Sequence, residues 1–379
     1  MVGLDQGFWR GCRVFLTGHT GFKGSWLTVW LSTLGAKIVG FSLPPYTQPN
    51  LFSLVAQGLA TDIYGDVTDN RVLLQALADA DPEIIIHMAA QSLVRPSYVD
   101  PLGTFATNIL GTANLLDGAR HLSNLRAVLV VTSDKVYENQ EKDTAFSEND
   151  ALGGYDPYSA SKAGAEIITA SFRRSFFASG PRVASARAGN VIGGGDWAPF
   201  RIMTDIVAAR AAGQPVELRY PRSVRPWQHV LEPLAGYLMY VEALAGGHDV
   251  PNALNFGPEP TNFRTVAELA DAFTTRWSGK PGWVQALGSH SHEASHLTLS
   301  PEKARRSLGW APLLTFDETV GWTADWYASH TGGKDVSDLT RSQIADFSAR
   351  LQTANRSTAL AGADRTGSEA TSSGNRGLV

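Results

Sequence analysis

The chain has 379 residues, of which 43% are hydrophobic, so it can bury a large core in two or three domains or in one large α/β domain with an appendage. Its net charge of -4 and isoelectric point near 6.1 argue against broad binding to nucleic acid or to anionic membranes. The single cysteine, Cys12, excludes a disulfide framework and a cysteine-rich zinc site, and we expect a cytoplasmic protein. Glycines and a lysine interrupt the apolar stretch 15–34, so we expect neither a signal peptide nor a membrane span there.

Short apolar runs alternate with helical stretches between residues 13 and 191. The candidate strands are residues 14–16, 37–41, 84–87, 127–131 and 183–187. This alternation predicts an α/β fold, a Rossmann-type doubly wound parallel sheet with helices on both faces. We assign residues 1–190 to this nucleotide-binding domain, to which some later segments return. Residues 191–330 are predicted to form a smaller, mixed α/β substrate domain, and residues 352–379, which lack aromatic side chains, a disordered tail.

A glycine-rich loop, Thr-Gly-His-Thr-Gly-Phe-Lys-Gly at residues 17–24, follows the first predicted strand and opens into a helix. Glycines let the backbone approach a pyrophosphate closely, and the N-terminus of the following helix offers unpaired N–H groups. The loop therefore predicts a dinucleotide site. Its candidate cofactor-binding residues are Gly18, Thr20, Gly21, Phe22, Lys23 and Gly24.

Two further positions bear on the cofactor. Asp66 is expected to accept a hydrogen bond from the adenine amino group while Val67 packs on the ring, although Asp66 also fits a simple turn. The second predicted strand ends at residues 41–43 without the acidic residue that commonly binds the adenosine ribose, and without an arginine for a ribose phosphate. This strand therefore leaves the choice between NAD and NADP open.

Tyr158 and Lys162 are four residues apart, so on a helix they share one face, and the ammonium is expected to lower the pKa of the phenol. Such a tyrosine is a suitable base for a hydroxyl proton. Ser133 follows a buried strand, which places its hydroxyl at the carboxyl edge of the sheet, where doubly wound folds bind ligands. Taken alone, the Tyr–Lys pair also fits an exposed helix surface.

Together these motifs resemble the extended short-chain dehydrogenase/reductase family over about residues 10–330. The motifs are the glycine-rich loop, the segment 87–91, Asn108 with Gly111 and Thr112, Ser133, and Tyr158 with Lys162. Within that family, the segments 40–44, 133–135, 225–230 and 292–294 resemble the CDP-glucose 4,6-dehydratases. The resemblance implies NAD as a tightly held cofactor regenerated in each turnover, CDP-glucose as substrate, and Ala89 and Gln91 as further cofactor contacts. It also implies a homodimer formed by helices around residues 102–120 and 158–177.

The resemblance further implies a mechanism. Tyr158, assisted by Lys162, removes the C4 hydroxyl proton while hydride passes to the cofactor, and Ser133 hydrogen-bonds the developing ketone. Asp134 protonates the departing C6 oxygen and Lys135 removes the C5 proton. Both need shifted pKa values, which burial is expected to provide. The alternative is that Asp134 and Lys135 form an ion pair in which Lys135 is structural.

Candidate substrate contacts lie mainly in the second predicted domain. Arg225 suits a diphosphate because a guanidinium matches two phosphate oxygens, although residues 225–227 also fit an interdomain turn. Arg201 is a second phosphate candidate. The remaining candidates are Asn190 for the sugar or its phosphate, Trp227 and His229 for the nucleotide pocket, and Gln91, Arg95 and Ser97 beside the glucose.

His290, His292 and His296 lie near one another in the sequence, but without a helical frame or a cysteine we do not expect them to bind zinc. Two alternatives to a dehydratase remain. A nucleotide-sugar epimerase or ketoreductase of the same fold would not need an acid and a base at Asp134 and Lys135. A non-catalytic NAD sensor would be expected to lack Tyr158 or Lys162.

Overall fold

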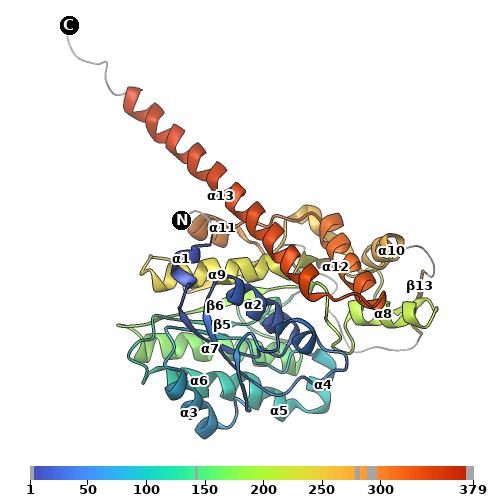
Figure 1. Ribbon diagram of the computed structural model, residues 1–379, viewed down its shortest axis with the longest axis horizontal. Helices are drawn as coiled ribbons and strands as arrows, with labels where there is room; N and C mark the ends of the chain where they lie inside the picture. Colours follow the sequence, from blue (N-terminus) through green and yellow to red (C-terminus); the bar gives the residue numbers. More distant parts are fainter. Residues whose placement is uncertain (1–3, 141–143, 278–281, 288–296, 373–379) are drawn as a thin grey trace.

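A computed structural model describes residues 4–140, 144–277, 282–287 and 297–372, with side chains up to residue 354. At its centre lies a parallel sheet with the strand order β11-β6-β5-β4-β1-β2-β3 (Figure 1). The strands are β1 (Arg13–Thr17), β2 (Lys37–Ser42), β3 (Thr61–Tyr64), β4 (Ile84–His87), β5 (Ala127–Val131), β6 (Arg182–Ala188) and β11 (Ala253–Phe256). The predicted doubly wound α/β fold is confirmed, and each of the five predicted strands is present.

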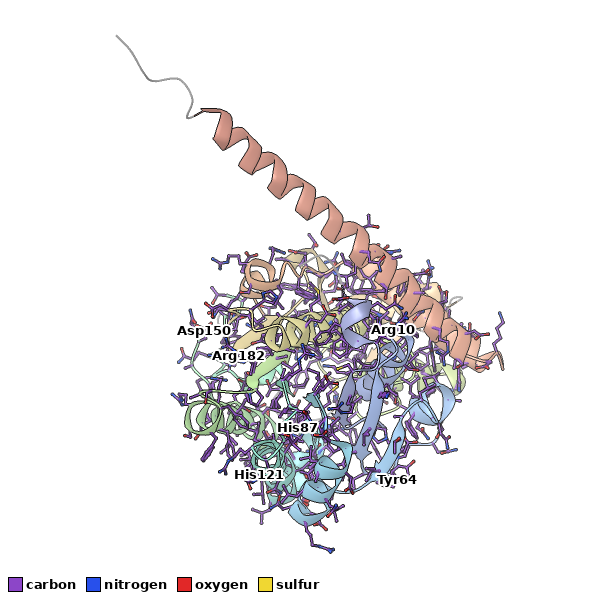
Figure 2. The ribbon with its side chains drawn as sticks, turned by 60° about the vertical axis from the view of Figure 1, so that its left-hand side comes forward. Arg10, Tyr64, His87, His121, Asp150 and Arg182 are labelled. Carbon is purple, nitrogen blue, oxygen red and sulfur yellow. The ribbon has the colours of Figure 1, made fainter. Side chains whose placement is uncertain are left out.

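Side chains alternate between two hydrophobic cores, one on each face of the sheet. In β1, Val14 and Leu16 join one core and Phe15 joins the other. The first core is shared with α2 (Phe22–Thr33), α9 (Leu231–Ala245) and α12 (Phe316–Thr331), and the second with α3 (Asn70–Ala80), α6 (Gly111–Ala119) and α7 (Pro157–Phe176). Because both faces are covered, the central strands are apolar along their whole length. Figure 2 shows His87, at the end of β4, in the interior of the packed body.

Short helices connect the strands of the first half. They are α1 (Gln6–Trp9), η1 (Phe52–Ala56), α4 (Val94–Val99), α5 (Pro101–Phe105), η2 (Ala106–Leu110) and the single turn η3 (Asp134–Val136). The long helix α7 begins where its sequence predicts. The Asp156 carboxylate accepts from Ser159 N at 3.0 Å, and Pro157 occupies the first helical position, where no intrahelical N–H bond is needed.

After β6 the chain forms a second region of short paired strands and helices. Its two-stranded pairs are β7 (Val191–Ile192) with β10 (Gln228–His229), β8 (Val216–Leu218) with β13 (Trp283–Gln285), and β9 (Val224–Pro226) with β12 (Phe263–Thr265). Its other helices are α8 (Ile202–Ala211), η4 (Pro260–Asn262), α10 (Val266–Arg276) and α11 (Glu302–Leu308). Helix α9 and strand β11, which come later in the chain, also belong to the central sheet and its covering layer: β11 pairs with β6, and α9 packs against β5 and β6.

The last helix, α13 (Ser337–Ser372), packs on the first core at its start and then extends away from the body (Figures 1 and 2). Phe347 lies edge-on to Trp30, and Ile344 and Leu351 are buried. The sequence predicted a disordered tail over residues 352–379, whereas the structure continues the helix over residues 352–372. A segment without aromatic residues cannot bury much surface, but helical hydrogen bonds are local, and residues 352–372 contain no proline that would interrupt them. Over the residues that the structure describes, no helix has both the length and the apolar character to cross a bilayer.

Candidate active site

A cavity of about 1280 Å³ lies between the carboxyl edge of the central sheet and the second region. It brings together nearly all of the residues that the sequence singled out. Those lining it are Gly18, Thr20, Gly21, Phe22, Lys23, Gly24, Asp66, Val67, Ala89, Gln91, Arg95, Ser133, Asp134, Lys135, Tyr158, Lys162, Asn190, Arg201, Arg225 and Trp227. Ser97 and His229 do not line it.

The glycine-rich loop forms one wall and has the close packing that a dinucleotide site needs. Gly18 has φ +76°, and a Cβ there would lie 2.7 Å from the backbone N of Ala89. A Cβ at Gly24 would lie 2.1 Å from the carbonyl oxygen of Gly18. Since α2 begins at Phe22, its unpaired N–H groups face the loop, and these residues fit a bound pyrophosphate.

At the end of β2, hydroxyl groups stand where an acidic residue is common. Thr20 Oγ1 lies 2.7 Å from Ser42 Oγ and donates to the carbonyl oxygen of Leu43 at 2.9 Å. Asp66 accepts from Thr68 N at 2.8 Å, which is the predicted alternative of a turn, yet it still lines the cavity. The adenine contacts of Asp66 and Val67 therefore remain predictions.

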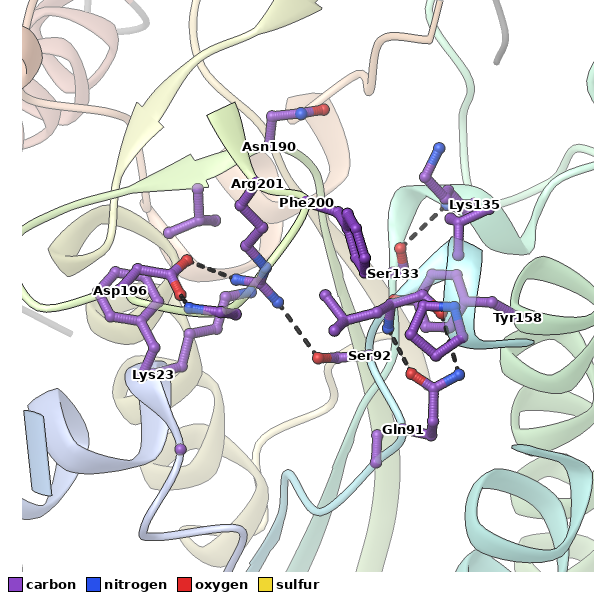
Figure 3. Close-up of a pocket in the computed structure, with 18 of the residues that line it drawn as sticks. Lys23, Gln91, Ser92, Ser133, Lys135, Tyr158, Asn190, Asp196, Phe200 and Arg201 are labelled. Carbon is purple, nitrogen blue, oxygen red and sulfur yellow. Dashed lines mark hydrogen bonds and ion pairs between the residues drawn. The ribbon is translucent and has the colours of Figure 1, made fainter. Parts of the chain in front are cut away.

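Ser133, Asp134 and Lys135 follow strand β5 and line the cavity. Figure 3 shows Ser133 and Lys135 there. Ser133 Oγ donates to Asp134 Oδ1 at 2.9 Å and accepts from Lys135 N at 3.2 Å. Asp134 is 4% exposed, and its Oδ2 has no hydrogen-bond partner among the described residues. Burial raises the pKa of Asp134 against the lowering effects of Lys135, Ser133 and Arg225, as predicted. Lys135 is only half-buried, so the expected burial of both side chains is wrong for Lys135.

Tyr158 and Lys162 lie on the first turns of α7, and both are buried. The Lys162 ammonium donates to the carbonyl oxygen of Val131 at 3.3 Å. Burial raises the pKa of Tyr158 to about 12, with a hydrogen bond from Ser133 lowering it. Burial lowers the pKa of Lys162 to about 8, while Glu166 raises it.

The predicted lowering of the Tyr158 pKa by Lys162 is therefore wrong for this arrangement. Desolvation of the phenolate outweighs the lowering effects of the Ser133 hydrogen bond and of the Arg201 charge, so the pKa of Tyr158 is raised and not lowered. The hydrogen bond with Ser133 and the charge of Arg201 both stabilise the phenolate form of Tyr158.

Arginines from the second region face the catalytic segment. Arg201 Nη1 forms an ion pair with Asp196 at 2.7 Å, and its Nη2 donates to Ser92 at 3.2 Å (Figure 3). Arg225, on β9, is buried and its charge lowers the pKa of Asp134. Both guanidinium groups line the same cavity as Asn190, so their predicted phosphate roles remain open to test.

Two predicted substrate contacts are wrong. The Ser97 hydroxyl is buried, donates to Val94 O at 2.6 Å and accepts from Tyr158 N at 3.2 Å, so it supports the start of α7. His229 is buried between Trp26 and Trp322 because its side chain on β10 points into the core, where desolvation lowers its pKa to about 3.

Trp227 has features of both roles predicted for it, a place in the nucleotide pocket and a packed turn. It is 2% exposed and donates to Arg264 O at 3.0 Å, as a packed turn residue does, and it also lines the cavity.

Sequence reasoning missed two side chains of the cavity, Asp196 and Phe200, and the reach of a third, Lys23. Lys23 was chosen for its loop position, but its ammonium reaches the catalytic region, where burial lowers its pKa to about 7 and Asp134 raises it. Asp196 follows a glycine run and binds Arg201. Phe200 has φ +66° and lies under Arg95, whose guanidinium is 5.0 Å from the ring centroid. Lys23 was visible as the single lysine of the glycine-rich loop, whereas nothing in the sequence marks the backbone angle of Phe200.

The described residues contain no group of three or more histidine, cysteine or acidic side chains arranged to hold a metal ion. His290, His292 and His296, together with the segment 292–294, lie outside the described residues.

Comparison with known proteins agrees with this geometry. The family profile described as GDP-mannose 4,6 dehydratase matches residues 15–323. The chain belongs to this family. It is 43% identical over 352 residues to the CDP-glucose 4,6-dehydratase of Salmonella typhimurium, covering 91% of this chain and 98% of that protein. It is 26% identical to the dTDP-glucose 4,6-dehydratase of Xanthomonas campestris pv. campestris, covering 83% and 93% of the two chains. The family resemblance that the sequence motifs predicted is confirmed.

Solved structures share the fold. The epimerase Mth375 of Methanothermobacter thermautotrophicus aligns with a TM-score of 0.76 and 22% identity, covering 89% of this chain and 96% of that one. DesIV, the dTDP-glucose 4,6-dehydratase of Streptomyces venezuelae with NAD and TYD bound, aligns with a TM-score of 0.73 and 23% identity, covering 85% and 99%. The dehydratase and the epimerase thus have the same architecture, so the fold alone does not separate their activities.

Proposed function

We propose that this protein is a CDP-glucose 4,6-dehydratase that converts CDP-D-glucose to CDP-4-dehydro-6-deoxy-D-glucose and water with NAD. The observation that carries the proposal is the meeting of Asp134 and Lys135 with Ser133, Tyr158 and Lys162 in one cavity. An epimerase or ketoreductase needs no elimination acid and base. The similarity to the Salmonella typhimurium enzyme supports CDP-glucose as the substrate.

NAD, when bound, supplies the hydride acceptor for C4 and the hydride donor for C6. The glycine-rich loop and the start of α2 would hold its pyrophosphate. Tyr158 accepts the C4 hydroxyl proton, and Ser133 donates a hydrogen bond to the C4 oxygen as it becomes a ketone. Since burial raises the pKa of Tyr158 to about 12, the phenolate forms only where its charge is compensated.

The ketone at C4 acidifies the C5 proton, which Lys135 removes while Asp134 protonates the C6 hydroxyl, so that water leaves and a C5–C6 double bond forms. The product is complete once a proton returns to C5 and C6 takes up the hydride that NAD would supply. The raised pKa of Asp134 favours the protonated form that an acid needs. Lys135 lies half-buried at the same cavity wall, on the turn that immediately follows Ser133.

The test is incubation of the purified protein with CDP-glucose, and separately with dTDP-glucose and GDP-mannose, following product mass for loss of water. We expect loss of water from CDP-glucose. The Lys135→Ala variant is expected to lose water about 10²- to 10⁴-fold more slowly, as removal of a general base does. Lys37 is exposed at the first residue of β2, the end of the strand that lies away from the cavity. The control variant Lys37→Ala should therefore retain the wild-type rate.

Two results would reject the proposal. Absence of water loss from every nucleotide sugar would favour an epimerase or a sensor. If Lys135→Ala still exchanged the C5 proton with solvent at the wild-type rate, Lys135 would not be the base and would be assigned instead as a structural partner of Asp134.

We also propose a cytoplasmic homodimer. Helices α4, α5 and η2 pack against α7, and together these helices carry apolar side chains on the outside of the molecule. Val99 is 86% exposed, Leu102 78%, Leu110 52% and Ile167 57%. We call these four residues the α5–α7 face. A second copy that covers this face through its own α5–α7 face would bury them symmetrically.

A further inference from the structure

Glu166 is a buried carboxylate for which the proposed reaction has no use. It lies on α7, one turn after Lys162, and is 4% exposed. Its oxygens accept from Thr132 Oγ1 at 2.5 Å and from Ser185 Oγ at 2.6 Å. Arg187 donates to it twice, at 3.0 and 2.8 Å. This complete set of donors lowers the pKa of Glu166 in spite of its burial, so the carboxylate keeps its negative charge.

The charge of Glu166 acts on the lysine of the active site. Burial drives the pKa of Lys162 down, and Glu166 is the group that raises it. From the other elements packed around it, Lys162 faces Lys23 on the glycine-rich loop and His87 at the end of β4, and its positive charge lowers the pKa of both. Glu166 is therefore the negative charge that compensates this cationic lysine.

The same carboxylate also fixes the backbone that carries the catalytic segment. Thr132, which donates to Glu166, immediately precedes Ser133. On the other side, Arg187 donates to Tyr137 Oη at 2.7 Å, and Tyr137 donates to Asn255 Oδ1 at 2.7 Å. The contacts thus join α7, the end of β5, β6 and β11 through one buried ion pair.

We propose that Glu166 is a positioning residue. Its buried carboxylate, bound by Arg187, holds through Thr132 the backbone that leads to Ser133 and whose Val131 carbonyl oxygen accepts from the Lys162 ammonium, one helical turn away on α7. A buried ion pair seldom stabilises a fold more than apolar residues of the same size, so its retention here calls for another role. The catalytic consequence rests on the proposed function, whereas the effect on the charge of Lys162 does not.

The test uses the variant Glu166→Gln and the double variant Glu166→Gln/Arg187→Met. The double variant leaves no unpaired buried charge, so it remains informative if the single variant does not fold. The titration of Lys162 is followed by the NMR signal of its ¹³Cε atom in the protein without substrate, assigned with Lys162→Arg. We expect the titration midpoint to fall by about one pH unit in both variants. The alkaline limit of CDP-glucose dehydration should move to lower pH by the same amount.

Glu148→Gln is the matched control. Its side chain is 3% exposed, accepts from Asn255 N at 2.7 Å and pairs with Lys303 at 3.7 Å, so it is a buried acid at the far end of the same contacts. It should leave the Lys162 midpoint unchanged. An unchanged midpoint in the folded double variant would overturn the inference and leave Glu166 with a structural role only. A shifted midpoint in a protein that does not dehydrate CDP-glucose would support the inference on Lys162 while rejecting the proposed function.

Discussion

Asp134 and Lys135 are neighbours in the sequence, yet the fold gives them different surroundings. The Asp134 carboxyl is buried with one oxygen unpaired among the described residues, and its pKa is raised. The Lys135 side chain is half-buried at the cavity wall. A buried carboxyl with a raised pKa and an adjacent lysine that reaches the same cavity fit the two roles that the proposed elimination needs. Sequence reasoning found both residues, but the difference in burial appears only when the turn η3 is seen.

Glu232 gives a prediction about stability and pH. It lies on α9 at 1% exposure and accepts from Leu313 N and Leu314 N at 2.9 and 2.7 Å. Burial raises its pKa from 4.5 to about 8. The folded protein therefore holds a proton that the unfolded chain releases. The resulting stability is fully present below about pH 4.5 and is lost as pH rises through about 8.

Glu232→Gln keeps an acceptor for both N–H groups without the titration. We expect its free energy of unfolding to match the wild type at pH 5 and to exceed it by about 1–3 kcal/mol at pH 9. Urea denaturation at the two pH values measures this difference. If the difference in free energy of unfolding between variant and wild type were the same at pH 5 and pH 9, Glu232 would not be protonated in the folded protein.

At the scale of elements, the glycine-rich loop and α2 give a prediction about cofactor binding. A Cβ at Gly24 would overlap the Gly18 carbonyl oxygen at 2.1 Å, and its nearest neighbours are all backbone atoms of Gly18 and His19, which cannot move aside as a flexible side chain can. We expect Gly24→Ala to weaken NAD binding at least about tenfold, equivalent to about 1.4 kcal/mol. Gly282→Ala is the control because a Cβ there meets nothing within 4 Å. Calorimetric titration with NAD compares the two, and unchanged affinity in a folded Gly24→Ala protein would contradict a pyrophosphate site at this loop.

The elements differ in how far their sequences predict them. The five predicted strands are buried apolar runs, a pattern that local sequence shows directly. Strand β3 was not recognised because it lies at the edge of the sheet, and its residues 61–64 are half-buried or exposed. Strand β11 was not recognised because its partner β6 is distant in the chain and only the folded sheet brings them together. Helix α7 was predictable as a helix from its Tyr–Lys spacing, and its start is fixed by Asp156 and Pro157.

At the scale of the whole molecule, the cavity depends on contacts between distant segments. Residues whose roles rest on a local motif, such as Gly18 and Ser133, lie where the sequence predicts. Ser97 and His229 were misplaced because each lies on a very short element, the six-residue helix α4 and the two-residue strand β10, whose orientation decides whether a side chain faces the cavity or the core. The Lys23 ammonium was missed for the same reason, since its neighbours Asp134 and Arg201 come from other parts of the chain.

The proposed homodimer is the last feature that belongs to the whole molecule. The α5–α7 face exposes aliphatic side chains from both of the helical segments for which the family resemblance implies pairing. Replacing Leu102 and Ile167 by glutamate would place four charges in a symmetric interface, because each copy contributes the same surface. We expect the double variant Leu102→Glu/Ile167→Glu to have half the wild-type mass in light scattering coupled to gel filtration.

Val284→Glu is the control for the dimer, since Val284 is 45% exposed on β13 and is not part of the α5–α7 face. It should keep the wild-type mass. The active-site cavity is lined by one chain alone, so a monomeric variant should still bind CDP-glucose. Because the α5–α7 face includes the outer side of α7, which carries Tyr158 and Lys162 on its inner side, loss of the partner is expected to lower thermal stability and turnover together. A wild-type mass equal to that of one chain would contradict the dimer without affecting the proposed reaction.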